Sequence, residues 1–118
     1  MTAVDTLLIF TNLPDRASAL GLARDLVEAR CAACVNVLGG CTSVYRWQGE
    51  IETAEEVPVL IKTRSALYGA VEQAIRARHP YDVPEIIAVP VSQGLPSYLE
   101  WVETATLPPA SERIAGAD

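Results

Sequence analysis

The chain has 118 residues, half of them hydrophobic and a fifth charged, and its nine basic against fifteen acidic residues give a net charge of −6. This length predicts one domain, with a core large enough to need neither disulfides nor a structural metal. The acidic balance excludes the basic face that non-specific nucleic-acid binding requires, and it argues equally against a polybasic membrane-surface role.

The sequence also argues against a membrane-spanning or secreted protein. No stretch approaches the roughly 18 consecutive apolar residues of a transmembrane helix. The first residues lack the basic start and apolar run of a secretory signal, because Asp5 interrupts them. Three cysteines are an odd number, so we expect all three as thiols in a reducing compartment. We therefore expect a cytoplasmic protein.

The chain opens with a strand followed by a helix. Residues 6–12 form a short run rich in strand-forming side chains, which predicts a strand. Asp15 is placed to cap the helix that follows, because its carboxylate can accept from free amides of the first turn. Apolar residues at helical spacing extend this helix over 16–30.

A long hairpin comes next. Residues 33–47 and 51–63 are typical of two strands, and the turn between them contains a glycine that can adopt a positive φ. The pair Gly39-Gly40 predicts a bulge or bend inside the first of these strands. Both strands are longer than usual, so we expect the hairpin tip to project past its own sheet.

The second half of the chain predicts two helices and a strand. Residues 65–78 form a helix that Ser65 caps, and a proline ends it. Residues 85–91 form the last strand. Ser97 and Glu100 have the spacing of a capping box, which predicts a short third helix.

This order of elements predicts an α+β fold of the β-α-β-β-α-β type. Such a fold is a sandwich in which an antiparallel sheet carries both long helices on one face. A short C-terminal helix completes it. We assign residues 1–105 to this single domain and residues 106–118 to a flexible C-terminal tail, whose composition suits no regular element.

Both faces of the predicted sheet are apolar. Leu7 and Ile9 would lie on one face of the first strand, and Leu8 and Phe10 on the other. Two helices on one side cannot cover both faces, and a contiguous apolar patch is rarely left in water. We therefore expect another copy of the chain to cover the second face.

Several motifs carry a resemblance to a known family. In order, they are Ala32-Ala33-Cys34-Val35-Asn36, Tyr45-Arg46-Trp47-Gln48-Gly49, Lys62-Thr63, His79-Pro80-Tyr81 with Pro84-Glu85-Ile86, and Tyr98-Leu99 with Trp101. At this spacing they resemble the CutA divalent-cation tolerance proteins. The resemblance implies a ferredoxin-like fold, an interlocked homotrimer related in architecture to the PII signalling proteins, and a role in tolerance to copper and other divalent metals.

The candidate metal site centres on His79, the only histidine. With Asp82 and Glu85 it places a nitrogen and two carboxylates close together, and Cys34 is a candidate thiol ligand for copper or zinc. Some family members are thought to bind copper through a first-strand thiol and a histidine pair, but Phe10 and Arg78 occupy those positions here. The alternative interpretation is structural: the imidazole would bond backbone carbonyls at a helix end, and the thiol would be a small buried hydrophobe. We expect no required cofactor.

A second candidate site is a cleft between subunits. Its predicted lining is Tyr45, Trp47, Lys62, Tyr81 and Glu85. In PII-like trimers such clefts hold small anionic ligands, so the alternative function is a sensor of that kind. The competing interpretation is interface packing, because tyrosine and tryptophan are common at interfaces.

The remaining predictions concern the interface, the acidic residues and catalysis. The resemblance and the apolar pattern assign four residues to the trimer interface: Phe10, Tyr45, Trp47 and Trp101. Four glutamates crowd the returning hairpin strand, and we interpret them as a solvated face that protects a sheet edge: Glu50, Glu52, Glu55 and Glu56. No pattern of nucleophile and base points to an enzyme.

Overall fold

The computed structural model describes residues 5–109. Its elements follow the predicted order: β1 (Thr6–Leu13), α1 (Arg16–Glu28), β2 (Cys34–Val37), β3 (Cys41–Trp47), β4 (Glu50–Arg64), the 3₁₀ helix η1 (Ser65–Leu67), α2 (Tyr68–Arg78), β5 (Ile86–Pro90) and α3 (Pro96–Ala105). The predicted second strand is therefore split into β2 and β3, whereas β4 runs without interruption for 15 residues.

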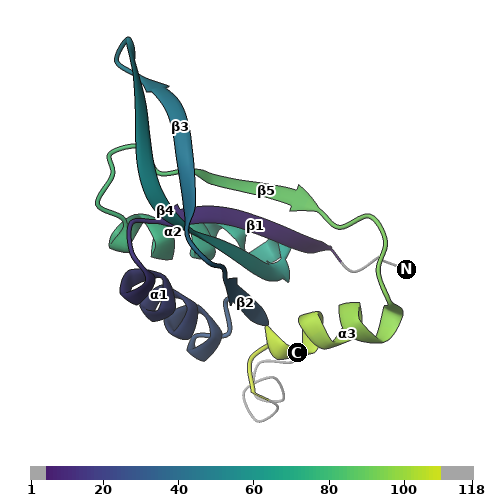
Figure 1. The fold of residues 1–118 in the computed structure, drawn as a ribbon. Helices are drawn as coiled ribbons and strands as arrows, with labels where there is room; N and C mark the ends of the chain where they lie inside the picture. The colour runs from purple at the N-terminus through teal and green to yellow at the C-terminus, as the bar shows by residue number, and fades with distance from the viewer. Residues whose placement is uncertain (1–4, 110–118) are drawn as a thin grey trace.

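The sheet is antiparallel and has the order β2-β4-β1-β5, with β3 paired to β4 beyond the end of β2. Both α1 and α2 lie on one side of this sheet (Figure 1). This arrangement is a ferredoxin-like α+β sandwich, as the sequence predicts. The face that α1 and α2 cover is called the closed face below, and the other is the open face.

The core lies between the closed face and the two helices. Alternate residues of the central strands point into it, and Ile9, Val59 and Ile61 have no exposed surface. From the helices, Leu22 and Ile75 pack against them. Full burial of such side chains contributes roughly 1.5–3 kcal/mol each, so this layer stabilises the single chain.

The β3–β4 hairpin projects from the sheet, as the strand lengths predict (Figure 1). Val37 pairs with Val59 but Cys41 pairs with Glu56, so four steps along the first strand match three along β4. The extra residue is a bulge at Gly39-Gly40, which bends the chain out of the sheet. The tip is a two-residue turn in which Gln48 and Gly49 have φ of 51° and 85°.

The starts of two helices differ from the predictions. Ser65 lies in η1, its amide donates to the Asp5 carbonyl at 2.7 Å, and α2 begins only at Tyr68 without a side-chain cap. The capping box at Ser97 is also wrong. Helix α3 begins at Pro96, because a proline at the first position has a fixed φ and no amide to be capped.

The packed part of the chain reaches past residue 105. Thr106 is buried and caps α3, and Arg64 donates to its hydroxyl at 2.9 Å and to its carbonyl at 3.1 Å. The predicted flexible tail therefore does not begin at Thr106, and residues 110–118 of that prediction lie outside the described residues.

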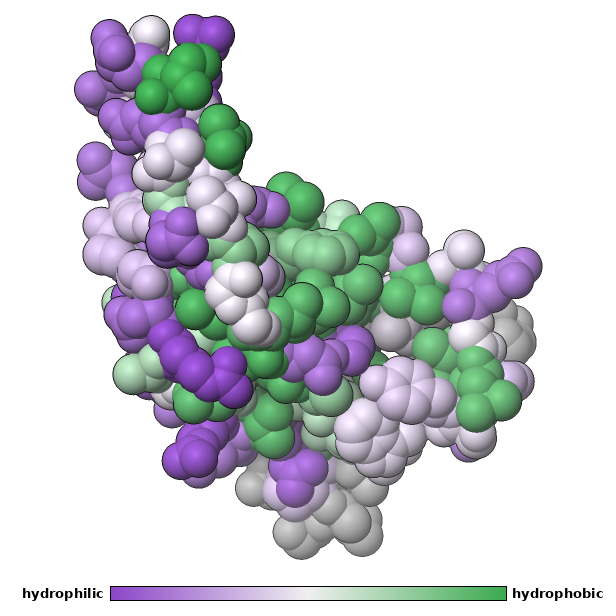
Figure 2. Space-filling view, viewed as in Figure 1, coloured by the Kyte–Doolittle hydropathy of each residue, from purple (hydrophilic) through white to green (hydrophobic). Residues whose placement is uncertain are grey.

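The open face carries two apolar rows that run across the strands. Leu60, Phe10 and Ile87 are direct neighbours in the register, and Leu8 lies beside Val89 in the next row. Helix α3 covers only the end of this face near Arg64. Ile87 stays 54% exposed and Val89 45% exposed. Figure 2 shows apolar residues gathered across the middle of the molecule, between the hairpin and α3.

Candidate functional site

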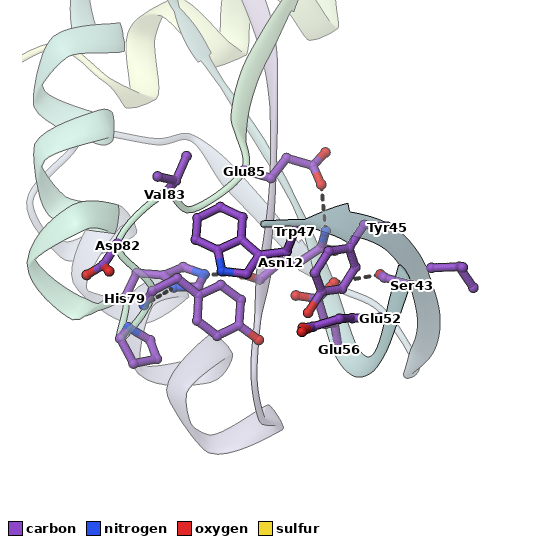
Figure 3. Close-up of a pocket in the computed structure, with 13 residues that line it drawn as sticks. Asn12, Ser43, Tyr45, Trp47, Glu52, Glu56, His79, Asp82, Val83 and Glu85 are labelled. Atoms are coloured by element: carbon purple, nitrogen blue, oxygen red, sulfur yellow. Dashed lines mark hydrogen bonds between the residues drawn. The ribbon is translucent and has the colours of Figure 1, made fainter. Parts of the chain in front are cut away.

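A pocket of about 770 Å³ lies between the hairpin and the segment that joins α2 to β5. The hairpin contributes aromatic, hydroxyl and acidic side chains to it, and the 79–85 segment supplies the facing wall (Figure 3). A volume of this size is typical of small-molecule sites. The lining residues are Asn12, Ser43, Val44, Tyr45, Trp47, Glu52, Glu56, His79, Pro80, Tyr81, Asp82, Val83 and Glu85.

Strand alternation explains which hairpin residues line the pocket. Ser43, Tyr45 and Trp47 are two residues apart on β3, so their side chains leave the strand on one side. The register places Tyr45 opposite Glu52 on β4, and the side chain of Ser43 reaches Glu56. The two-residue turn fixes this register.

Glu56 is the most enclosed acid of the pocket. Only 8% of it is exposed, and its Oε1 accepts a hydrogen bond from the Ser43 hydroxyl at 2.6 Å. The carboxylate also raises the pKa of Tyr81, where burial is the larger cause and the nearby negative charge disfavours the phenolate. The prediction that Glu56 belongs to a solvated edge is therefore wrong, because the inner side of the hairpin encloses this residue.

His79 closes the pocket at the end of α2, and both of its ring nitrogens have backbone partners. Nε2 lies 2.5 Å from the Asn12 carbonyl, and Nδ1 accepts from the Tyr81 amide at 3.3 Å. Because an amide can only donate, Nδ1 is the acceptor, and Nε2 carries the proton that it donates to Asn12. The Tyr81 ring also packs on the imidazole, with 4.5 Å between ring centres.

Asn12 joins the two walls of this region at the end of β1. Its carbonyl accepts from His79, and its side-chain amide donates to Glu85 Oε1 at 2.8 Å. These contacts connect residues more than 65 positions apart in the chain. They fix the orientation of an imidazole and a carboxylate that both line the pocket.

The structure brings most of the predicted ligand-cleft residues together, but not all of them. Tyr45, Trp47, Tyr81 and Glu85 line this one pocket. Lys62 does not, because it points to the open face, where its Nζ donates to the Asn36 side chain. Lys62 is therefore not part of the pocket that a single chain forms, and its place in a cleft between subunits stays a prediction.

The predicted metal ligands are also divided. His79, Asp82 and Glu85 line the pocket, whereas Cys34 lies in β2 and pairs with Lys62 across the sheet. In residues 5–109, no group of three or more His, Cys, Asp or Glu side chains is arranged to hold a metal ion. Cys34 is therefore no partner of His79 within one chain.

The charge of the pocket disfavours an anion. Four carboxylates line it, from Glu52, Glu56, Asp82 and Glu85, and the lining residues include no lysine or arginine. An anionic ligand would meet only like charge, because Lys62 lies elsewhere. Within one chain the pocket therefore has no positive charge for an anion, and the sensor predicted for a cleft between subunits stays a prediction.

The predicted interface residues lie in three places. Phe10 is half-buried on the open face, Trp101 is 46% exposed on α3 and stacks on Tyr98, and Tyr45 and Trp47 turn into the pocket. On the opposite side of the hairpin, Ile51 is 63% exposed. The exposed apolar surface is thus wider than the four predicted residues.

The pocket residues that the sequence analysis does not predict include Asn12, Ser43 and Glu52. The sequence does contain a signal for Ser43 and Glu52. Counting alternate residues outward from the turn places their side chains on the same side of the hairpin as Tyr45. For Asn12 no local signal exists, since its partners come from a segment distant in the sequence.

Comparisons with known proteins agree with this architecture. The profile of the CutA1 divalent ion tolerance protein family matches residues 7–105. The crystal structure of CutA from Xylella fastidiosa is 50% identical and superimposes with a TM-score of 0.84, covering 87% of this chain and 99% of that one. The divalent-cation tolerance protein CutA of Thermus thermophilus is 41% identical over 98 residues, which are 83% of this chain and 95% of that protein.

The mouse protein CutA is 47% identical over 97 residues, which are 82% of this chain but only 55% of the mouse protein. The match therefore spans about half the length of this relative. The profile and these relatives together show that the chain belongs to the CutA1 divalent ion tolerance family. In the described part of the chain, no helix has the length and apolar character to cross a membrane.

Proposed function

We propose that this divalent ion tolerance protein works as a homotrimer in the cytoplasm, and that copies associate through the open face of the sheet. The observation that carries this proposal is the pair of apolar rows across that face, with Ile87 and Val89 about half exposed in the single chain. The number three comes from the family resemblance. Free thiols at all three cysteines suit a reducing compartment.

The energetics favour such an association. Apolar side chains on the open face gain roughly 1.5–3 kcal/mol each on full burial, and β5 is an edge strand with an unpaired side. Leu60, Phe10 and Ile87 form one contiguous row instead of scattered positions. Contiguous apolar surface of this kind is typical of association sites.

Two matched variants test this interface. Val89→Asp places a charge on the open face, and Ala88→Asp places the same charge at the next exposed position, on the other side of β5. Light scattering should give a mass near three times the 12.7 kDa of one chain for the wild type and for Ala88→Asp. Val89→Asp should lower the mass while far-UV circular dichroism stays unchanged. An unchanged mass for Val89→Asp would contradict the proposed interface.

We further propose weak binding of a divalent cation, copper or zinc, by His79 with Asp82 and Glu85. These three side chains line one pocket whose other charges are negative. Weak binding is expected because the three side chains do not converge on one metal position in residues 5–109 and would have to move to do so. In addition, Nδ1 must give up the Tyr81 amide, or Nε2 the Asn12 carbonyl, before the imidazole can coordinate a metal. Nothing in this arrangement calls for a catalytic role.

Calorimetric titration of Cu²⁺ and Zn²⁺ tests this proposal. His79→Ala should lower the affinity at least about tenfold. Glu100→Gln, an exposed charge change on α3 outside the pocket, should leave it unchanged. Equal affinities of the wild type and His79→Ala would remove His79 from the metal site.

A further inference from the structure

The acidic pocket and the open face lie on the same side of β4. This strand runs without interruption for 15 residues, so alternate side chains keep to one side along its whole length. Leu60 belongs to the open face, and counting from it in steps of two places Lys62, Glu56 and Glu52 on that side as well. A second copy that covers the open face therefore also meets the pocket.

Glu56 has hydrogen-bond partners within one chain, and both of them are neutral. Its carboxylate accepts from the Ser43 hydroxyl at 2.6 Å and shares a hydrogen bond with the Tyr81 phenol. Only 8% of the residue is exposed, and a copy that covers this side removes that remaining contact with water. Keeping a carboxylate ionised without water is costly unless a cation takes the place of the water. The interface between copies therefore favours a positive charge opposite Glu56.

Lys62 is the cation of residues 5–109 that the open face can offer. Its side chain is half-buried, and its Nζ donates to the Asn36 side chain, which is neutral. Arg64 on the same side is already held by the hydroxyl and the carbonyl of Thr106. Arg46 leaves the hairpin on the side away from the pocket. The other arginines of residues 5–109 belong to the helices on the covered side of the sheet or directly follow α1 (Figure 1): Arg16, Arg24, Arg30, Arg76 and Arg78.

Lys62 and Glu56 cannot meet within one chain. Both lie on β4, and the six residues between their positions place them roughly 20 Å apart along an extended strand. This separation is several times the length of a lysine side chain. Any contact between these two residues must therefore join two copies. In a closed ring, each copy can offer its Lys62 to one neighbour and its pocket to the other.

From these positions we propose that Lys62 of one copy enters the pocket of the next copy and pairs with Glu56. The inference rests on the proposed association through the open face, and it makes the pocket a site that only the assembly completes. The pairing exchanges the bond of Lys62 to a neutral amide for a charge-assisted one. Glu56 belongs to the hairpin wall, so the ammonium group lies across the pocket from the 79–85 segment (Figure 3).

The experiment is a double-mutant cycle on the rate at which copies separate. Isotope-labelled and unlabelled assemblies of the full chain are mixed, and native mass spectrometry follows the exchange of subunits. Lys62→Met and Glu56→Gln each remove one charge and nearly preserve side-chain size, and each should speed exchange at least about tenfold, because the other charge is left buried and unpaired. The double variant should exchange no faster than the faster single variant, because it leaves no unpaired charge.

Two further variants serve as controls. Glu55 accepts from the Thr42 hydroxyl at 2.7 Å, much as Glu56 accepts from Ser43, but it does not line the pocket. Glu55→Gln should therefore change the exchange rate less than about twofold, and its effect should multiply with that of Lys62→Met. Lys62→Arg keeps the charge and should exchange within about threefold of the wild type.

The outcomes separate this pairing from the association on which it rests. If the effects of Lys62→Met and Glu56→Gln multiply in the double variant, the two residues act independently and the pairing is overturned. Exchange that is unchanged in Lys62→Met overturns it equally, while the wild type remains an assembly. A wild type that is a monomer at every concentration would instead overturn the proposed association, and the pairing with it.

Discussion

On the closed face of the sheet Ile9, Val59 and Ile61 are completely buried, whereas on the open face of the same sheet Ile87 and Val89 remain about half exposed. The difference does not lie in the chemistry of the side chains, because both faces carry large aliphatic groups. It lies in what covers them, since α1 and α2 both pack on one side (Figure 1).

This difference separates two roles within one fold. The closed face holds the single chain together, and the open face has surface left for another copy. The hairpin forms a third environment, in which neither side is covered by a helix and the inner side encloses a pocket. Variants that alter one environment at a time can break or sharpen this comparison.

The largest effect is expected from removing a closed-face side chain. Ile61→Ala leaves a cavity in the core and should lower the free energy of unfolding by about 2–5 kcal/mol in urea titrations. Ile87→Ala, the same change on the open face, should chiefly lower the mass measured on dilution. The comparison breaks if Ile87→Ala leaves the mass unchanged and costs as much stability as Ile61→Ala.

A smaller effect separates two threonines on the closed face. The Thr63 hydroxyl donates to the Cys31 carbonyl at 2.6 Å, whereas the buried Thr11 hydroxyl has no partner among the described residues. Thr63→Val should cost about 1–3 kcal/mol, because it leaves a carbonyl unpaired, and Thr11→Val should be neutral or stabilising. Thermal unfolding measures both. Equal losses would show that the Thr11 hydroxyl is bonded in solution.

The hairpin turn should give a gain in stability. Gln48 has a φ of 51°, which costs energy for most side chains, and asparagine is preferred in this type of turn. Gln48→Asn should therefore raise the free energy of unfolding by a few tenths to about 1 kcal/mol. Gln93→Asn, in a loop where no positive φ is found, is the control. No gain from Gln48→Asn would mean that the hairpin does not unfold together with the sheet.

The smallest effect concerns the pocket at alkaline pH. The pKa of Tyr81 is raised above its ordinary value of 10.0, by burial first and by Glu56 second. A raised pKa means that the folded state holds its proton more tightly than the unfolded state. Stability is therefore complete below about pH 10 and falls as the pH rises through the raised pKa. Phenolate absorbance should show Tyr81 ionising at a lower pH in Glu56→Gln, and an unchanged titration would separate the two groups.

The sequence predicts the layers of this fold better than it predicts the pocket. Alternation along β1 assigns Leu8 and Phe10 to a second apolar face, and the glycine pair predicts the bulge, because both signals are local. The prediction that Glu56 belongs to a solvated face is wrong, because its burial depends on which side of the hairpin faces His79. Contacts such as Asn12 to Glu85 depend on packing between distant segments, which no spacing rule contains.

The position of Lys62 also depends on strand pairing that its local sequence does not show. A lysine at the end of a strand, beside aromatic side chains, is typical of a cleft that holds a small anion. Strict alternation from Leu60 instead places it on the open face, beside Asn36. The register between β2 and β4 fixes this position, so the pocket of a single chain has carboxylates in its lining and no lysine or arginine.

The central claim is that another copy of the chain covers the open face. Light scattering or sedimentation of the wild-type protein over a series of dilutions tests it most directly. We predict a particle of three times 12.7 kDa that persists on dilution into the micromolar range and below. A stable particle of 12.7 kDa at every concentration, with Ile87 and Val89 in water, would contradict the account.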